Sequence, residues 1–125
     1  MTNGGGRANV SGMPEPTPTP AVLLLCRDLM FLSKVTATAK ATGVAVRVVR
    51  DPAQLPQAGG RLFVDLNQEG ALEAAAAWRT ATGGEVVGFV SHVDTNTIQR
   101  ARGLGLDHVY PRSRFTAELE QLLRR

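Results

Sequence analysis

The sequence predicts an α/β domain built around a five-stranded parallel sheet. Short apolar runs, of the kind that form buried strands, alternate along the chain with segments whose apolar residues recur at helical spacing. The connections between successive runs can hold crossovers, and a strand–crossover–strand unit places its two strands parallel. Glycines and prolines stand at most of the junctions, where turns are needed. We therefore expect a sheet covered by helices on both faces.

The five expected strands are short and rich in valine, leucine and phenylalanine. They occupy residues 21–25, 44–49, 61–66, 86–90 and 107–110. The first is apolar at every position, which is typical of a strand buried on both faces. The second is strongly β-branched, which favours strand over helix.

Four helices and one short helical turn are expected between and after these strands. They occupy residues 28–43, 69–82, 94–103 and 115–123, with the turn at 52–57. Asp28 can cap the first helix through its carboxylate, and Gly43 suits the end of that helix. The second full helix is rich in alanine, with Leu72 and Trp78 available to face the sheet.

Residues 1–20 differ in composition from the rest of the chain, because they hold four glycines and four prolines with little apolar surface. Such a segment buries too little to offset the entropy of ordering it, so we expect a disordered arm before a domain at 21–125. The arm lacks the apolar core of a secretory signal, and the run at 21–25 is too short to span a bilayer. We expect a cytoplasmic protein with no membrane contact.

The charge and the cysteine content exclude several kinds of site. The net charge is +3, the basic residues are scattered, and no aromatic residues are interleaved with them for base stacking, so we expect no nucleic-acid binding. A single cysteine cannot form an internal disulfide. With two histidines it gives no metal-ligand spacing either.

Two parallel-sheet folds are compatible with this pattern. One is a flavodoxin-like, three-layer α/β/α domain with strand order 2-1-3-4-5, and the other is a fragment of a dinucleotide-binding fold. The turn after the first strand reads Cys26-Arg27-Asp28, without a glycine that would let a pyrophosphate approach the backbone. The sequence therefore favours the flavodoxin-like order and disfavours a nucleotide cofactor.

Polar residues follow the carboxyl ends of the expected strands, where chemistry gathers in open parallel sheets. The most informative is Asp65, which stands near the end of the third strand. The others are Cys26, Arg27 and Asp28 after the first strand, Arg50 after the second, Ser91 and His92 after the fourth, and Arg112 after the fifth.

In order and spacing, these residues resemble the receiver domain of bacterial response regulators over residues 21–123. The resemblance implies that Asp65 stands in place of the phosphate-accepting aspartate and Ser91 in place of the switch hydroxyl. The stretch Gly105-Leu-Asp-His-Val-Tyr-Pro-Arg112 is similar to the G-A-D-x-(apolar)-x-x-K passage of that family. Arg112 then takes the place of the family's lysine.

The sequence departs from the family where a magnesium ion would bind. The resemblance implies an acidic pair at the end of the first strand, but Cys26 and Arg27 stand there. Magnesium prefers several oxygen ligands, which these two side chains do not offer. Asp28 and Asp65 would hold a metal only in a rearranged site. We therefore expect no cofactor and no enzymatic activity, that is, a pseudo-receiver.

Several alternatives for these residues stay open. Asp65 can simply cap the turn that follows it, form an ion pair with Arg27 or Arg112, or remain a phosphate acceptor. Cys26 is expected to be a buried apolar residue rather than a reactive thiol. A nucleophile–base pair at Ser91 and His92 is disfavoured, because adjacent residues of a strand point to opposite faces.

The leading functional hypothesis is a non-catalytic signalling domain that acts through protein–protein contact. A partner protein or a second copy would dock on the face formed by the fourth helix, the fifth strand and the fifth helix, counting the turn at 52–57 as the second helix. Basic residues lie along this face: Arg100, Arg102, Arg112 and Arg114. One alternative is a phosphorylatable stand-alone receiver that uses Asp65. The other is a small domain of the same fold that binds a phosphate or carboxylate ligand through Arg27, Arg50 and Arg112.

Overall fold

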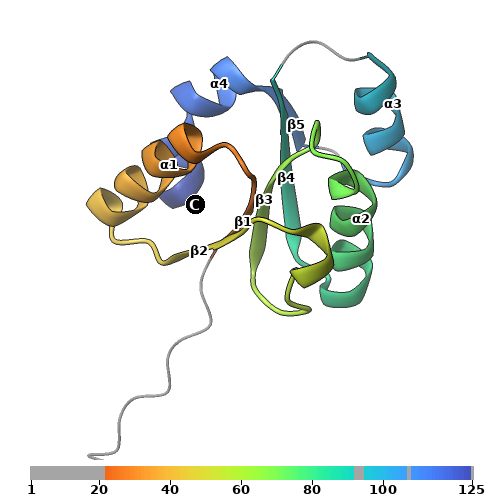
Figure 1. Ribbon diagram of the computed structural model, residues 1–125, viewed down its shortest axis with the longest axis horizontal. Coiled ribbons are helices and arrows are strands. Elements are labelled where there is room, and N and C mark those ends of the chain that lie inside the picture. Colours follow the sequence, from red (N-terminus) through yellow and green to blue (C-terminus); the bar gives the residue numbers. More distant parts are fainter. Residues whose placement is uncertain (1–21, 92–94, 107, 125) are drawn as a thin grey trace, which may run out of the picture.

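The computed structural model describes residues 22–91, 95–106 and 108–124. Five parallel strands form one sheet in the order β2-β1-β3-β4-β5, as the sequence predicted (Figure 1). The strands are β1 (Val22–Leu25), β2 (Val46–Val49), β3 (Arg61–Asp65), β4 (Glu85–Val90) and β5 (His108–Pro111). The helices are α1 (Leu29–Thr42), η1 (Pro52–Gln54), α2 (Ala71–Thr82), α3 (Thr95–Gly103), α4 (Arg112–Ala117) and α5 (Leu119–Arg124). No helix in these described ranges is long and apolar enough to cross a membrane.

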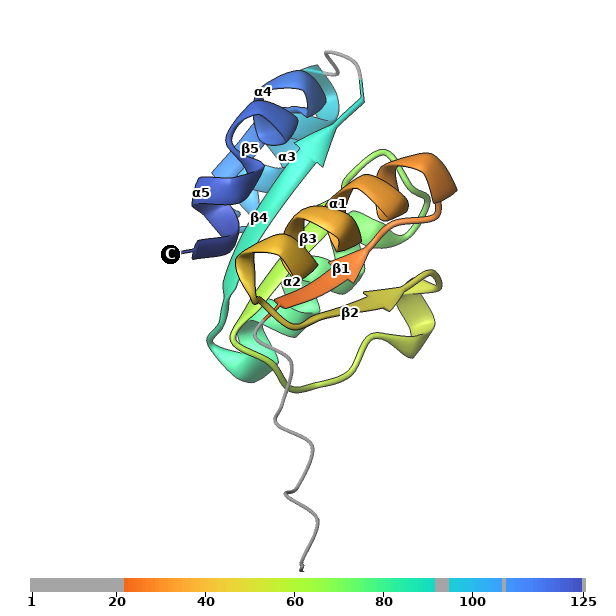
Figure 2. The same ribbon diagram turned by 90° about the vertical axis from the view of Figure 1, so that its left-hand side faces the viewer.

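The helices cover both faces of the sheet. Helices α1, α4 and α5 lie on one face and α2 and α3 on the other (Figures 1 and 2). Alternate residues of β1 serve the two faces, since Val22 and Leu24 belong to one buried cluster and Leu23 and Leu25 to the other. The all-apolar first strand is therefore buried on both faces, which is what its composition predicted.

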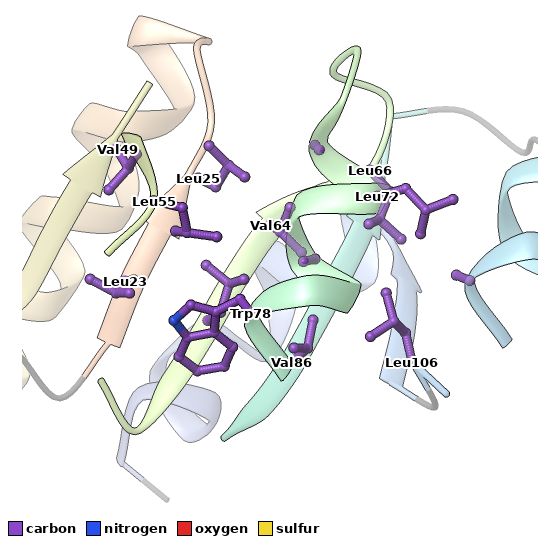
Figure 3. Close-up of a cluster of buried hydrophobic side chains, with 14 of the residues drawn as sticks. Leu23, Leu25, Val49, Leu55, Val64, Leu66, Leu72, Trp78, Val86 and Leu106 are labelled. Atoms are coloured by element: carbon purple, nitrogen blue, oxygen red, sulfur yellow. The ribbon is translucent and has the colours of Figure 1, made fainter. Parts of the chain in front are cut away.

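Trp78 is the largest side chain of the α2 face. It is fully buried against the sheet among leucines and valines (Figure 3), and its indole nitrogen donates a hydrogen bond to the carbonyl of Ala58 at 3.3 Å. A buried indole needs such a partner for its N–H group. The backbone of Gly84 lies close to this ring, and a Cβ atom added at this position would be 2.4 Å from the nearest ring carbon.

The final helix differs from the prediction. It begins at Arg112 instead of residue 115, and it is divided at Glu118 into α4 and α5. Pro111 ends β5 with φ −58°, a value that its ring fixes and that suits the entry to a helix, so the helix starts at the next residue. Arg61 at the start of β3 donates hydrogen bonds to the carbonyls of Leu122 and Leu123, which satisfies the last turn of α5.

Smaller differences concern the starts of elements. Helix α2 begins at Ala71 because the residues before it form a turn that ends at Gly70, whose φ is +79°. Strand β2 begins at Val46 rather than at residue 44. The arm at residues 1–20, Asp94 at the start of the helix expected over 94–103, and His92 lie outside the described residues.

We predict that Gly84→Ala destabilises the domain, because its methyl group would force the Trp78 ring out of its packed position. Overpacking of this kind costs about 1–3 kcal/mol of unfolding free energy. Urea denaturation, followed by the fluorescence of Trp78, measures this loss.

The matched control is Gly103→Ala, at the last residue of α3. No atom lies within 4 Å of the added carbon there, and alanine favours a helix by up to ~1 kcal/mol over glycine. Equal stability of the two variants would contradict the close approach of Gly84 to the ring.

Candidate functional site

The carboxyl ends of β1, β3, β4 and β5 meet at one edge of the sheet and bring the predicted site residues together. Leu25 pairs with Val64, so Cys26 follows beside Asp65, and Asp65 itself pairs with Phe89 of β4. Ser91 comes directly after β4, and Arg112 begins α4 directly after β5. The parallel topology alone therefore explains this constellation.

Asp65 is half-buried and caps the turn that follows β3. Its Oδ1 accepts a hydrogen bond from the backbone N–H of Asn67 at 3.0 Å, and its carbonyl accepts one from Gln68 at 3.2 Å. Burial raises the pKa of the Asp65 carboxyl, and repulsion from Asp28 adds to this, while the Asn67 hydrogen bond and the charge of Arg112 act in the opposite direction. The carboxylate thus lies where its charge is costly.

Arg112 forms its ion pair with Asp28. Its Nη2 lies 2.7 Å from Asp28 Oδ2, and its guanidinium carbon lies 4.2 Å from the centre of the Phe31 ring. Guanidinium groups favour both kinds of contact, a carboxylate at the edge and an aromatic face below. Arg112 therefore joins the start of α4 to the first turn of α1.

Asp28 also caps α1, as its position predicted. Its Oδ1 accepts hydrogen bonds from the backbone N–H groups of Met30 and Phe31, both at 3.1 Å. The hydrogen bond from Arg112 and these helix amides lower the pKa of the Asp28 carboxyl. Both oxygens of this carboxylate are thus engaged within the protein.

Cys26 is fully buried beside Asp65, as expected of a small apolar residue. Burial raises the pKa of the thiol, and a backbone hydrogen bond involving Asp28 opposes this only in part. The thiol therefore stays protonated at neutral pH, and a protonated thiol is a poor metal ligand.

These residues do not fit a magnesium ion. Within the described part of the chain, no three His, Cys, Asp or Glu side chains gather in a way that could hold a metal. Cys26 offers a neutral sulfur atom, and Asp28 is already bound by Arg112 and by two helix amides. Magnesium requires several oxygen ligands in near-octahedral geometry. A rearranged site on Asp28 and Asp65 would first have to break the Asp28–Arg112 ion pair.

The structure separates the three arginines that we considered as a possible anion site. Of the three, Arg112 acts electrostatically on Asp65, whereas Arg27 and Arg50 line a hollow of about 420 Å³ together with Asp51 and Pro52. Asp65 is not among the residues that line this hollow. Sequence spacing placed all three after strand ends but gave no direction for their side chains.

Two residues that the sequence analysis did not assign to the site, Asn67 and Gln68, hold its loops in place. Asn67 Oδ1 accepts a hydrogen bond from the backbone N–H of Ser91 at 2.5 Å, which ties the end of β4 to the turn after β3. Gln68 Nε2 donates to the carbonyl of Arg50 at 2.8 Å. Their place in a polar turn after a buried strand was the available sequence signal.

No family model and no curated protein matches this sequence. Solved structures do match it. A response regulator from Thermotoga maritima is 17% identical, with 86% of this chain and 96% of that chain covered and a TM-score of 0.64. The phosphorylated cyanobacterial phytochrome response regulator RcpA is 15% identical, with 86% and 90% covered and a TM-score of 0.66. The beryllofluoride-activated NtrC4 receiver domain dimer is 12% identical, with 82% and 95% covered and a TM-score of 0.64. The chain therefore has the fold of response-regulator receiver domains.

The two carboxylates should affect stability in opposite directions. The folded-state pKa of Asp65 is raised, so the contribution of Asp65 to the unfolding free energy is full at low pH and is lost as pH rises through the folded pKa. The folded-state pKa of Asp28 is lowered, so its contribution is full above the unfolded pKa and is lost as pH falls through the folded pKa. At neutral pH we expect Asp65→Asn to raise the melting temperature and Asp28→Asn to lower it.

Calorimetric melting between about pH 3 and about pH 7, a range that spans the ordinary pKa of aspartate, measures both effects. Both differences from wild type should shrink toward the acidic end. Asn is isosteric with Asp and keeps the oxygen that accepts from the backbone. A fall in melting temperature for Asp65→Asn at neutral pH would show that the carboxylate stabilises the fold.

Proposed function

We propose that this domain is a pseudo-receiver, a non-catalytic signalling domain that does not undergo the usual magnesium-dependent phosphorylation of Asp65. It acts through contact with a partner protein or a second copy of this chain, and the second copy is the partner tested below. The observation that carries the proposal is the Asp28–Arg112 ion pair at 2.7 Å, beside a buried thiol where the family resemblance implies a carboxylate.

The proposal rests on electrostatics at the acceptor residue. A phosphoryl group carries negatively charged oxygens, so it is repelled by the carboxylate that it approaches. A metal ion that bridges the two groups ordinarily offsets this repulsion. Here Cys26 is neutral, and the nearby cation Arg112 is held by Asp28. Burial already disfavours the negative charge of Asp65, and these neighbours offer no set of oxygen ligands for a metal ion that would offset it.

The aromatic packing beneath Arg112 favours a single state of this end of the domain. Phe31, under the guanidinium, packs against Phe89 and Phe115 at ring-centre distances of 4.8 and 5.8 Å. Phe115 also meets Phe63 edge-on at 5.3 Å. Moving Arg112 toward Asp65 would remove both its carboxylate and its aromatic contact, so we infer a domain that presents a constant surface.

The surface formed by α3, β5 and α4 is the proposed contact face. Arg102 is exposed on α3, and Leu104 beside it keeps 46% of its surface in water. On the α4 side, the guanidinium of Arg114 lies 5.2 Å from the centre of the Tyr110 ring. Arginine and tyrosine are enriched in protein–protein interfaces. The NtrC4 receiver domain, which shares the fold, is described as a dimer.

Phosphorylation is tested by intact mass after incubation with acetyl phosphate and magnesium. We expect no added phosphoryl group on the wild-type chain. The double variant Cys26→Asp/Arg27→Asp restores the acidic pair and should gain one phosphoryl group, because it supplies oxygen ligands for the metal. Adding Asp65→Asn to that variant should abolish the gain.

Circular dichroism of the double variant checks that the buried aspartate leaves the domain folded. A gain of mass on wild type that Asp65→Asn removes would replace our proposal with a phosphorylatable receiver. The phosphorylated response regulator RcpA has this fold, so a phosphorylatable receiver is the appropriate competing function.

The contact face is tested by sedimentation equilibrium. We expect the wild-type chain to self-associate and Arg102→Glu/Leu104→Asp to shift it to monomer, because both changes remove interface chemistry without touching the core. Arg47→Glu, an exposed arginine on the distant edge strand β2, is the control and should sediment as wild type. Self-association that persists in Arg102→Glu/Leu104→Asp would exclude this face.

A further inference from the structure

We infer that the hollow beyond the carboxyl ends of β1 and β2 is a binding site for a phosphate ester, held between Arg27 and Arg50. This inference goes beyond the proposed signalling function, because it uses neither Asp65 nor the α3–β5–α4 face. It uses two of the three arginines that the sequence offered as an alternative anion site.

The backbone places the two arginines side by side. Strands β1 and β2 are neighbours, and Leu25 pairs with Val49. Arg50 follows Val49 directly, and Arg27 comes two residues after Leu25. The N–H of Cys26 donates to the carbonyl of Val49 at 3.1 Å, which keeps the two strand ends together. Both side chains line the same hollow.

The charge of this pair is not neutralised within the described part of the chain. There, neither Arg27 nor Arg50 forms an ion pair or a side-chain hydrogen bond. Other arginines of the same ranges do have carboxylate partners: Arg100, Arg112, Arg114 and Arg124. The acidic residue that lines the hollow is Asp51, and its Oδ1 accepts from the N–H of Ala53 at 2.9 Å. The two guanidinium groups therefore share the hollow with one carboxylate, and one oxygen of that carboxylate already accepts a backbone hydrogen bond.

The loop that carries Arg50 is held in place before any ligand binds. The carbonyl of Arg50 accepts the hydrogen bond from Gln68, and the next residues form η1, which Asp51 caps and Pro52 begins. A fixed loop spends less entropy on binding than a mobile one. The hollow, at about 420 Å³, is within the size range of small-ligand sites.

The chemistry of the lining selects the ligand. A guanidinium group offers a planar fork of N–H donors that matches two phosphate oxygens, and two such groups balance a dianion. Asp51 would repel a bare anion but can accept a hydrogen bond from a hydroxyl group. A phosphate ester that also carries hydroxyl groups satisfies all three charged residues. Such an ester is found free, as in a sugar phosphate, or in a lipid headgroup.

The test is isothermal titration calorimetry of the full chain with glucose 6-phosphate and with inorganic phosphate. We expect the ester to bind, and Arg27→Gln and Arg50→Gln each to weaken it by about tenfold, since a charge-assisted hydrogen bond contributes about that factor. Arg47→Gln removes an exposed arginine three residues away, outside the hollow, and should leave binding unchanged. Asp65→Asn should also bind as wild type, which separates this site from the proposed signalling function.

Co-sedimentation with vesicles that contain phosphatidylinositol 4-phosphate, whose headgroup carries both a phosphate ester and hydroxyl groups, distinguishes the source of the phosphate. Binding to vesicles that both glutamine variants remove, with no binding of the free ester, would assign a lipid headgroup. Binding of the free ester that both glutamine variants weaken would assign a soluble ligand. If neither probe binds, or if binding survives both Arg27→Gln and Arg50→Gln, the inference is wrong.

Discussion

The position of the Arg112 guanidinium group determines which charges are paired at the carboxyl end of the sheet. Arg112 follows the last strand, yet it lies over Phe31 and against Asp28 in the first turn of α1. Because Asp28 also accepts the amides that begin α1, one carboxylate serves as both helix cap and ion-pair partner. The ring below belongs to a group of phenylalanines that reaches β3, β4 and α4. The first and last parts of the fold are thus joined at the edge where chemistry would occur.

The charges at this edge follow from that placement. Arg112 is paired with Asp28, and its charge does not offset the effect of burial on Asp65, so the pKa of the Asp65 carboxyl is raised. Cys26 contributes no charge, because its thiol is buried and its pKa is raised. Arg27 and Arg50, which follow β1 and β2, instead line a separate hollow.

Much of the architecture followed from the sequence because the signals were local. The all-apolar first strand required burial on two faces, and Asp28 stood where a helix cap belongs. The strand order followed from the flavodoxin-like fold, which the glycine-free turn after the first strand favoured. The destination of Arg112 was not predictable in this way, since the direction of a side chain after a strand depends on what packs opposite. The contact that closes the end of the last helix was not predictable either. Arg61, far away in sequence, holds the final turn.

The single tryptophan and the single tyrosine of the chain pack on opposite faces of the sheet. The single tryptophan, Trp78, belongs to the cluster between the sheet and α2, whereas the single tyrosine, Tyr110, packs against the phenylalanine cluster on the opposite face. Fluorescence of the indole therefore reports on one layer, and the tyrosine contribution to the second-derivative ultraviolet spectrum reports on the other. The unmodified protein carries separate optical probes for its two layers, so loss of one layer before the other would be visible as two non-coincident transitions.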